Sequence, residues 1–374
     1  VGGGNIGDDA IWVSLINGIK SRIPEAELVA FAGNPDDIEA RYGIPSYDLV
    51  WREPQPDIAA EKPGEASGNS LQHVAQNADQ SFFAALRKFV SDRIAPLREL
   101  YWDYSASKLD SIQHEKNSSM IPDFDLIVVA GGGQFDSLYG GPLKHPLTLW
   151  RWARSAKHNN VPLLILSVGA QRLQVPSKTL VRQTIARATY TTIRDEVSRS
   201  RIGGCAKSIA GIVPDLAYAY PVSEIPALPS ANADTVIVGV SPMIYADPRF
   251  YPIANAEVYQ NHIESLAEIS ARLLRLDHQV VLFASDKPDR EAQKELFEAI
   301  LKRVPSERHH LLTCADVDRI ADLIEVLGGV DLVIAARLHG VLLAHVMYRP
   351  AYAIAHDLKV RTLVEEIGQE AYCQ

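Results

Sequence analysis

The sequence predicts a doubly wound α/β fold, in which the strands of parallel sheets alternate with helices. Three observations predict it. Eight short runs, most of them rich in Val, Ile and Leu, are separated by stretches whose apolar residues have helical spacing. The runs lack the alternation of apolar and polar residues that half-exposed strands show, so they suit strands buried on both faces. The length of 374 residues suggests two domains of this kind.

The expected elements follow one another in a regular order along the chain. Proline-rich residues 221–233 hold few core residues and are predicted to link an N-terminal domain, 1–220, to a C-terminal domain, 234–374. The clearest expected helices are Asp9–Ile23, Glu291–Val304 and Ile320–Leu327. The expected strands are Glu27–Phe31, Asp125–Ala130, Val161–Val168, Tyr190–Arg194, Thr235–Val240, Gln279–Ala284, Asp331–Ala335 and Ala351–Ala355.

Residues 53–119 interrupt this alternation as an insertion. Residues 53–77 are polar and rich in Pro, Gly and Ser, which predicts a loop. Apolar residues from 82 to 104 then recur at three- and four-residue spacing, which predicts an amphipathic helix that restarts at Pro96. We expect this helix to cover the sheet; a lid or a partner-binding surface is the alternative.

Composition and charge exclude several classes of protein. Hydrophobic residues make up 47% and charged residues 22% of the chain, as in globular proteins. The net charge of −9 argues against a nucleic-acid partner. No run of uncharged apolar residues is long enough to span a membrane, and the chain does not open with a signal peptide. Three scattered cysteines argue against a disulfide framework and indicate a cytoplasmic protein.

A glycine run opens the chain just before the first expected helix. Gly2, Gly4 and Gly7 match the dinucleotide-binding pattern G-x-G-x-x-G, in which backbone N–H groups approach an anion at a helix N-terminus. A nicotinamide site also needs an acidic residue after the next strand, but the strand Glu27–Phe31 is not followed by one. Asp8 and Asp9 have two interpretations, as first-turn residues that cap the helix or as residues near a substrate.

A second glycine run follows the strand Asp125–Ala130. Gly131, Gly132 and Gly133 lie just past the carboxyl end of that strand, where open α/β sheets bind ligands. A tight turn would need one glycine rather than three. The run therefore favours a close approach of something to the backbone.

Basic residues stand at the carboxyl ends of three strands. Arg337-Leu338-His339 follows Asp331–Ala335 and begins a helix, where a cation opposes the helix dipole unless an anion binds between them. Arg194 follows a strand of the N-terminal domain, and Lys359 follows the last strand. Structural ion pairing and a solvated lysine are the alternatives; the clustering at strand ends favours an anion site.

These segments together resemble the polysaccharide pyruvyl transferase family. They occur in the family's order and cover nearly the whole chain. Two departures are His356, where the family usually has Tyr, and the insertion at 53–119. The matching pieces are Gly4-Asn5-Ile6-Gly7-Asp8, Gly131-Gly132-Gly133, Ser167-Val168-Gly169, Arg194-Asp195-Glu196-x-Ser198, Pro214-Asp215-Leu216-Ala217, Arg337-x-His339 and Lys359-x-x-x-Leu363-x-x-x-x-Gly368.

The resemblance implies a GT-B-like fold, with two Rossmann-like domains facing a cleft. It implies transfer of a pyruvyl group from phosphoenolpyruvate to a saccharide, with a pyruvate ketal and phosphate as products. The acceptors would belong to exopolysaccharides, cell-wall polymers or lipid-linked precursors. A lipid-linked acceptor would need only surface contact, so the protein is expected in the cytoplasm or at the inner face of the membrane.

The basic strand ends suit this chemistry. Phosphoenolpyruvate needs guanidinium groups for its phosphate and carboxylate, and a general acid for its methylene carbon. His339 is the candidate acid and Lys359 its rival, while Asp8 would accept the proton of the attacking hydroxyl. No ligand set for a metal is evident, and no cofactor besides the donor is expected. The expected substrate-binding residues are Arg337, Leu338, Arg194, Gly4, Asn5, Gly132 and Gly133.

Two other functions compete with this one. A GT-B glycosyltransferase would use a nucleotide sugar and need a ribose-binding carboxylate, for which Asp357 and Glu365 are available but not singled out by a pattern. The other alternative is a non-catalytic binding module of the same fold. The run from Arg337 to His339 weighs against that alternative.

Overall fold

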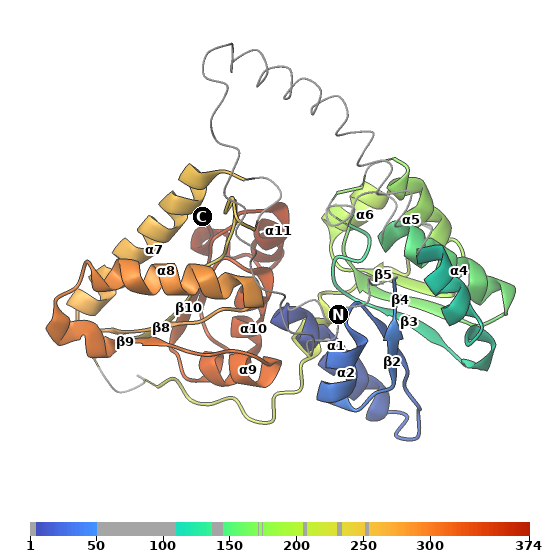
Figure 1. Ribbon diagram of the computed structural model, residues 1–374, viewed down its shortest axis with the longest axis horizontal. Coiled ribbons are helices and arrows are strands. Elements are labelled where there is room, and N and C mark those ends of the chain that lie inside the picture. Colours follow the sequence, from blue (N-terminus) through green and yellow to red (C-terminus); the bar gives the residue numbers. More distant parts are fainter. Residues whose placement is uncertain are drawn as a thin grey trace, which may run out of the picture.

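The computed structural model describes residues 5–50, 110–136, 145–170, 172–173, 175–204, 208–229, 234–250 and 254–374. Within these residues the chain forms two α/β halves that lie side by side (Figure 1). The loop expected at 53–77 and the helix expected at 82–104 lie outside the described residues, as does Gly4.

The N-terminal half contains two parallel sheets. A two-stranded sheet pairs β1 (Ala30–Ala32) with β2 (Ser46–Asp48), and a four-stranded sheet has the order β3-β4-β5-β6. Every strand of the larger sheet is parallel to its neighbour. Its strands are β3 (Ile127–Ala130), β4 (Leu163–Val168), β5 (Tyr190–Ile193) and β6 (Gly211–Ile212). The helices are α1 (Ile6–Lys20), α2 (Pro35–Tyr42), α4 (His145–His158), α5 (Ser177–Ile185) and α6 (Glu196–Ile202).

The C-terminal half is built on one five-stranded parallel sheet with the order β11-β10-β7-β8-β9. The strand order reverses between β7 and β10, which is where open α/β sheets leave a crevice at their carboxyl ends. Its strands are β7 (Ile237–Ser241), β8 (Gln279–Leu282), β9 (Leu312–Cys314), β10 (Leu332–Ala335) and β11 (Ala351–Ala353). The helices are α7 (Ala256–Arg275), α8 (Arg290–Leu301), α9 (Ile320–Gly328), α10 (Leu338–Val346) and α11 (Leu358–Glu366).

Local sequence signals account for the ends of the first helices. Asn5 caps α1, since its side chain accepts a hydrogen bond from the backbone N–H of Gly7. Pro35 opens α2, and Gly43 ends it at a φ of 64°, a left-handed conformation that favours glycine. The capping expected of Asp8 and Asp9 thus belongs to Asn5, and both aspartates lie in the first turn of α1.

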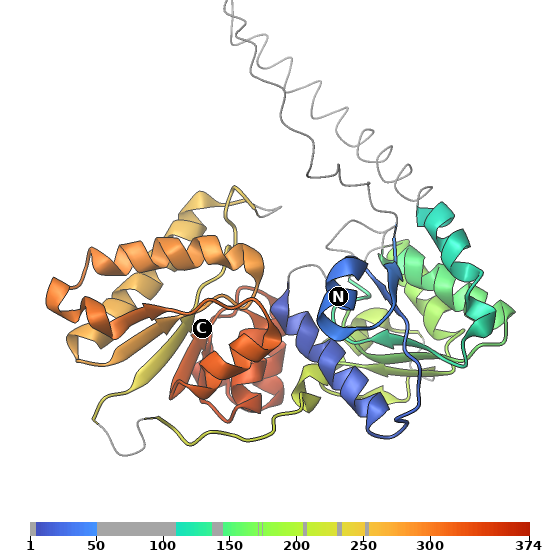
Figure 2. The same cartoon turned by 60° about the horizontal axis from the view of Figure 1, so that its bottom comes forward.

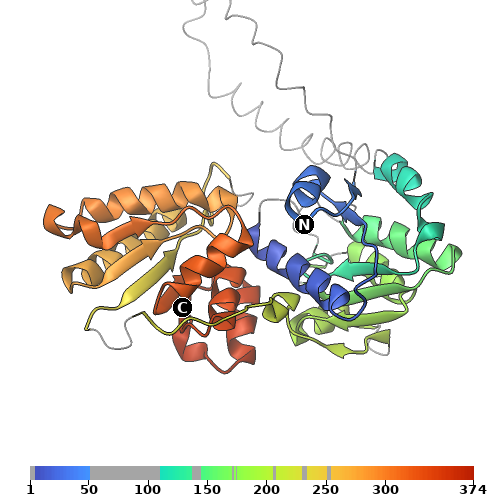
Figure 3. The same ribbon diagram turned by 90° about the horizontal axis from the view of Figure 1, so that it is seen from below.

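Helix α1 packs against both halves. Ile6, Ala10 and Ile11 are buried in the same cluster as Val341 and Leu342 of α10. The short 3-10 helix η3 (Leu216–Ala219), which precedes the connection to β7, also packs along α1. Figures 2 and 3 show α1 lying between the two halves, with the connecting segment passing beneath it. Apolar contacts of α1 therefore hold the two halves against each other.

The predicted α/β fold with mostly parallel sheets, arranged as two Rossmann-like halves in the GT-B manner, is confirmed. Each expected strand has a counterpart, although β1 begins three residues later than expected. The short strands β2, β6 and β9 were not predicted, because two or three residues are too few to show a pattern. Among the described residues, no helix combines the length and the apolar character needed to cross a membrane.

Candidate active site

His339 lies in the first turn of α10 and contacts the first turn of α1. A Cβ atom built on Gly7 would lie 2.1 Å from Cγ of His339, so the imidazole packs directly on the glycine. His339 is only 8% exposed. Within the described part of the chain its Nε2 atom has no hydrogen-bond partner. Two helix N-termini thus converge on one buried imidazole, and both supply positive potential for an anion.

The charges around His339 come from both halves of the protein. Nε2 of His339 lies 4.0 Å from Oδ2 of Asp215, a separation too long for a hydrogen bond. Burial lowers the pKa of His339; Asp215 and Asp8 oppose this effect, while Arg194 and Lys359 add to it. In this state the imidazole is therefore neutral near neutral pH.

Arg194, at the end of β5, is held by two carboxylates. Its Nη1 donates to Oδ2 of Asp215 at 3.2 Å, and its Nε donates to Oδ2 of Asp195 at 3.3 Å. The guanidinium also packs on Gly169, where a Cβ would lie 2.7 Å from Nη2. Since Arg194 is 9% exposed, direct contact with a donor would require one ion pair to open.

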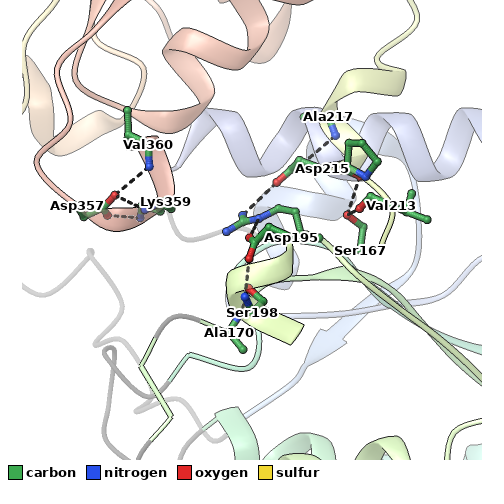
Figure 4. Close-up of polar contacts among 12 residues, drawn as sticks. Ser167, Ala170, Asp195, Ser198, Val213, Asp215, Ala217, Asp357, Lys359 and Val360 are labelled. Carbon is green, nitrogen blue, oxygen red and sulfur yellow. Dashed lines mark hydrogen bonds and ion pairs between the residues drawn. The ribbon is translucent and has the colours of Figure 1, made fainter. Parts of the chain in front are cut away.

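The two carboxylates are themselves fixed by the backbone. Asp195 accepts a hydrogen bond from the N–H of Ser198 as the cap of α6, and Asp215 accepts one from the N–H of Ala217. Figure 4 shows Asp195 and Asp215 close together, with Ser198 and Ala217 as their backbone partners. The backbone therefore fixes Asp215 in place, where it bonds Arg194 and lies 4.0 Å from Nε2 of His339.

Arg337 follows β10 and forms a bidentate ion pair. Its Nε lies 2.7 Å from Oδ2 of Asp289 and its Nη2 lies 2.9 Å from Oδ1. Asp286 provides a third oxygen at 3.1 Å. Asp289 is fully buried, and burial raises the pKa of Asp286 to about 6. The alternative considered for Arg337, pairing with nearby carboxylates, is thus present, and 18% of its side chain remains exposed.

Lys359 lies in the first turn of α11. Its Nζ is 3.2 Å from Oδ2 of Asp357, the residue whose Oδ1 accepts hydrogen bonds from the backbone N–H groups of Lys359 and Val360. Nε2 of His356 lies 3.5 Å from the same carboxylate. Figure 4 shows this turn and the labelled contacts of Asp357. The lysine expected as a rival acid is therefore a partly exposed cation near His339.

The other residues predicted from the sequence lie in different surroundings. Asn5 forms an isolated antiparallel bridge with Asp286, which brings the start of α1 to the carboxyl end of the strand β8. Leu338, in contrast, lies in the apolar core and is 7% exposed, so its side chain is not available to a substrate. Gly131 is approached by the side chain of Ile11, with a built Cβ 2.9 Å from Cγ2.

The glycines expected to bind substrate at this turn have looser surroundings. Gly132 has a φ of 68°, and Cδ1 of Ile11 lies 3.7 Å from its built Cβ. The nearest atom to a Cβ on Gly133 is Cβ of Asp136, at 3.9 Å. The close approach inferred from this glycine run is therefore, at Gly131, an approach of α1 itself.

Sequence reasoning did not assign a role to Asp215, Asp286 and Asp289. Asp286 stands four residues past the end of β8, so the rule that ligands bind at strand ends could have found it. Asp215 follows β6, a strand that was not predicted, and was noted only within the segment Pro214-Asp215-Leu216-Ala217. In the part of the chain that the structure describes, no group of three His, Cys, Asp or Glu side chains is placed to hold a metal ion.

Comparison with known proteins identifies the family. The model of the polysaccharide pyruvyl transferase family matches residues 5–357. A search of curated protein sequences finds no match. Solved structures with a similar chain path include HepE from Anabaena in complex with UDP and glucose, 15% identical over 95% of this chain and 79% of that chain, with a TM-score of 0.46.

Two further structures are similarly distant. A putative UDP-N-acetylglucosamine 2-epimerase from Listeria monocytogenes is 11% identical over 99% of this chain and 87% of that chain, with a TM-score of 0.49. The lipopolysaccharide outer core galactosyltransferase WaaB is 12% identical over 94% of this chain and 77% of that chain, with a TM-score of 0.44. The match over residues 5–357 shows that the chain belongs to the polysaccharide pyruvyl transferase family and is a polysaccharide-modifying transferase.

Proposed function

We propose that the protein transfers the pyruvyl group of phosphoenolpyruvate to two hydroxyls of one sugar, in a polysaccharide or a lipid-linked glycan precursor. The product is a pyruvate ketal, and phosphate is released. The observation that carries the proposal is the buried, unpartnered Nε2 of His339 where the N-termini of α1 and α10 meet. A buried polar atom without a partner costs free energy, which a function at that position explains.

The donor would bind where positive potential gathers. The N-termini of α1 and α10 supply backbone N–H groups, and Arg337 and Lys359 supply cationic side chains from neighbouring strand ends. Asn5, at the start of α1, would orient the anion. Arg194 would act through Asp215, because both of its carboxylate partners and its burial keep its guanidinium away from solvent.

The chemistry needs one acid and one base. His339 would protonate the methylene carbon of phosphoenolpyruvate, which makes the neighbouring carbon electrophilic. The first sugar hydroxyl adds to that carbon and gives its proton to Asp8. The second hydroxyl displaces the phosphate and gives its proton to that leaving group, so the donor and a diol become the ketal and hydrogen phosphate. Lys359 remains the alternative acid.

Donor binding would also prepare the acid. Burial keeps the pKa of His339 low without a ligand. A phosphate next to the imidazole would raise that pKa, since an opposite charge stabilises the protonated form. We therefore expect phosphoenolpyruvate to bind together with a proton.

Mass spectrometry of acceptor glycans incubated with the protein and phosphoenolpyruvate tests the reaction. We expect the mass of one ketal-linked pyruvate to be added, with phosphate released in equal amount. Calorimetry in two buffers of different ionisation enthalpy tests the linked proton, and His339→Gln should abolish proton uptake while phosphoenolpyruvate still binds. Turnover of His339→Gln close to that of the unmodified protein would exclude His339 as the acid and direct the test to Lys359.

A further inference from the structure

The outer helices of the N-terminal half are strongly basic. From residue 145 to residue 210 the chain has eleven Lys and Arg but only two Asp and Glu, a net formal charge of +9. The whole chain has a net charge of −9, so all other residues together carry −18. The overall charge, which argued against a nucleic-acid partner, conceals this separation.

Most of these basic residues belong to three neighbouring helices or directly follow one of them. Figure 1 shows α4, α5 and α6 side by side over one face of the sheet β3-β4-β5-β6. Nε1 of Trp150 in α4 donates to Gln183 in α5 at 2.8 Å, and the guanidinium groups of Arg154 and Arg187 lie 5.7 Å and 6.0 Å from the indole ring. Nε of Arg182 in α5 donates to the carbonyl of Ile202 at the end of α6. The three helices therefore pack against one another as one layer, and this layer carries most of the basic residues.

The two acidic residues of this segment neutralise only part of it. Asp195 pairs with buried Arg194, and Glu196 pairs with Arg199 at 3.7 Å. Basic residues in the last turn of a helix interact favourably with the helix dipole, which accounts for some of the basic residues in this segment. The dipole does not explain the lack of acidic residues, because α7 and α8, the corresponding outer helices of the other half, contain both acidic and basic residues. The surface residues that make up this basic face are Arg154, Lys157, Arg172, Lys178, Arg182, Arg187, Arg199 and Arg201.

We propose that this basic face docks the protein on an anionic lipid membrane. Its cations are spread over a layer of three helices, which suits a planar array of headgroups more than a single polymer strand. Each Lys or Arg near such a surface contributes about 1 kcal/mol, so several together give useful affinity. Val175, beside the start of α5, is 81% exposed and offers an apolar contact.

Docking in this way leaves the candidate active site open. The basic face covers one face of the sheet, whereas Asp215 and Arg194 lie beyond the carboxyl ends of β6 and β5. A bound protein would therefore hold its candidate active site beside the membrane. The proposal concerns membrane binding alone and does not depend on phosphoenolpyruvate as the donor.

Co-sedimentation with lipid vesicles tests the proposal on the full chain. We expect binding to vesicles of phosphatidylcholine mixed with phosphatidylglycerol, and none to phosphatidylcholine alone. Binding should weaken as salt is raised, since the Debye length shortens to about 8 Å at physiological ionic strength. The double variant Lys157→Glu, Arg201→Glu should bind about tenfold or more weakly.

A matched control uses two exposed cations at helix ends of the other half. Arg272 lies in the last turn of α7, and Lys302 is the residue that follows α8. Arg272→Glu, Lys302→Glu changes the net charge equally and should bind vesicles as the unmodified protein does. Equal weakening by both double variants, equal binding to neutral vesicles, or binding to double-stranded DNA without binding to vesicles would each overturn the proposal.

Discussion

His339 occupies the space that a side chain at Gly7 would need. The built Cβ of Gly7 lies 2.1 Å from Cγ and 2.2 Å from Nδ1 of the imidazole. The sequence explained Gly7 by the approach of an anion to the backbone. The structure adds a second reason, because the glycine lets α10 bring the imidazole against the first turn of α1.

Gly7→Ala should destabilise the protein and Gly18→Ala should not. The new methyl group at residue 7 has to displace the ring of His339, and overpacking of this kind costs about 1–3 kcal/mol. Gly18 lies in the same helix with no atom within 4 Å of its built Cβ, so alanine there should be neutral or stabilising by about 0.5–1 kcal/mol. Thermal unfolding of both variants measures the difference, and equal melting temperatures would contradict the contact.

Arg337→Ala should lower the free energy of unfolding by about 3–5 kcal/mol, since it leaves the buried carboxylate of Asp289 without its cation. From the sequence, Arg337 was expected only as a residue that binds the substrate. Arg290→Ala is the control: Arg290 pairs with exposed Asp316 and Asp318, and such surface pairs contribute about 0–1 kcal/mol. Denaturant unfolding of both variants tests the contrast, which fails if Arg337→Ala is as stable as Arg290→Ala.

The fold followed from the sequence because it rests on local patterns. The apolar strands, the helix spacing and the glycine turns all lie within a few residues of one another, and each predicted strand has a counterpart. The position of Arg337 and His339 at one strand end was predictable for the same reason. Leu338, between them, was predicted to bind substrate, whereas the helix turn rotates its side chain into the core.

The partners of these residues were not predictable in this way. Asp289 lies 48 residues before Arg337, and Asp215 joins Arg194 to His339 across the two halves. Such pairs depend on how whole elements pack, and no periodicity in one chain records that packing. The burial of His339 against α1 is likewise a contact between distant elements.

Asp215→Asn should shift the pH dependence of turnover. Asp215 opposes the lowering of the His339 pKa, so its neutralisation should lower that pKa further. If protonated His339 is the acid, activity is lost as the pH rises through its pKa, and the alkaline limb should move to lower pH. The readout is phosphate release measured across the pH range.

Asp195→Asn serves as the control for this shift. It also removes one carboxylate from Arg194, but Asp195 is not among the groups that act on His339. Both variants should lose stability, while only Asp215→Asn should move the alkaline limb. Identical shifts in the two variants would mean that the effect comes from Arg194 and not from His339.

Asp9 makes stability depend on pH. Burial raises the pKa of Asp9 to about 6, although Arg41 lies 2.9 Å away. An unfolded aspartate releases its proton near pH 4, so between about pH 4 and 6 the folded state holds more protons than the unfolded state. The free energy of unfolding should therefore fall as the pH rises through this window, by on the order of 2–3 kcal/mol for this group. The loss is complete about one pH unit above pH 6.

Asp9→Asn should reduce the fall in the free energy of unfolding between about pH 4 and 6. Asp286, whose pKa is also raised to about 6, contributes in the same window and remains in the variant. Arg41 keeps its ion pair with Asp37, so the variant should fold and be more stable than the unmodified protein at pH 7. Urea unfolding at pH 4.5 and pH 7 measures how much the free energy of unfolding falls in the variant and in the unmodified protein. Exposed Asp125→Asn is the control. An unchanged difference between the two pH values in Asp9→Asn would show that burial does not raise the pKa of Asp9, because a carboxylate already ionised at pH 4.5 gives no slope between them.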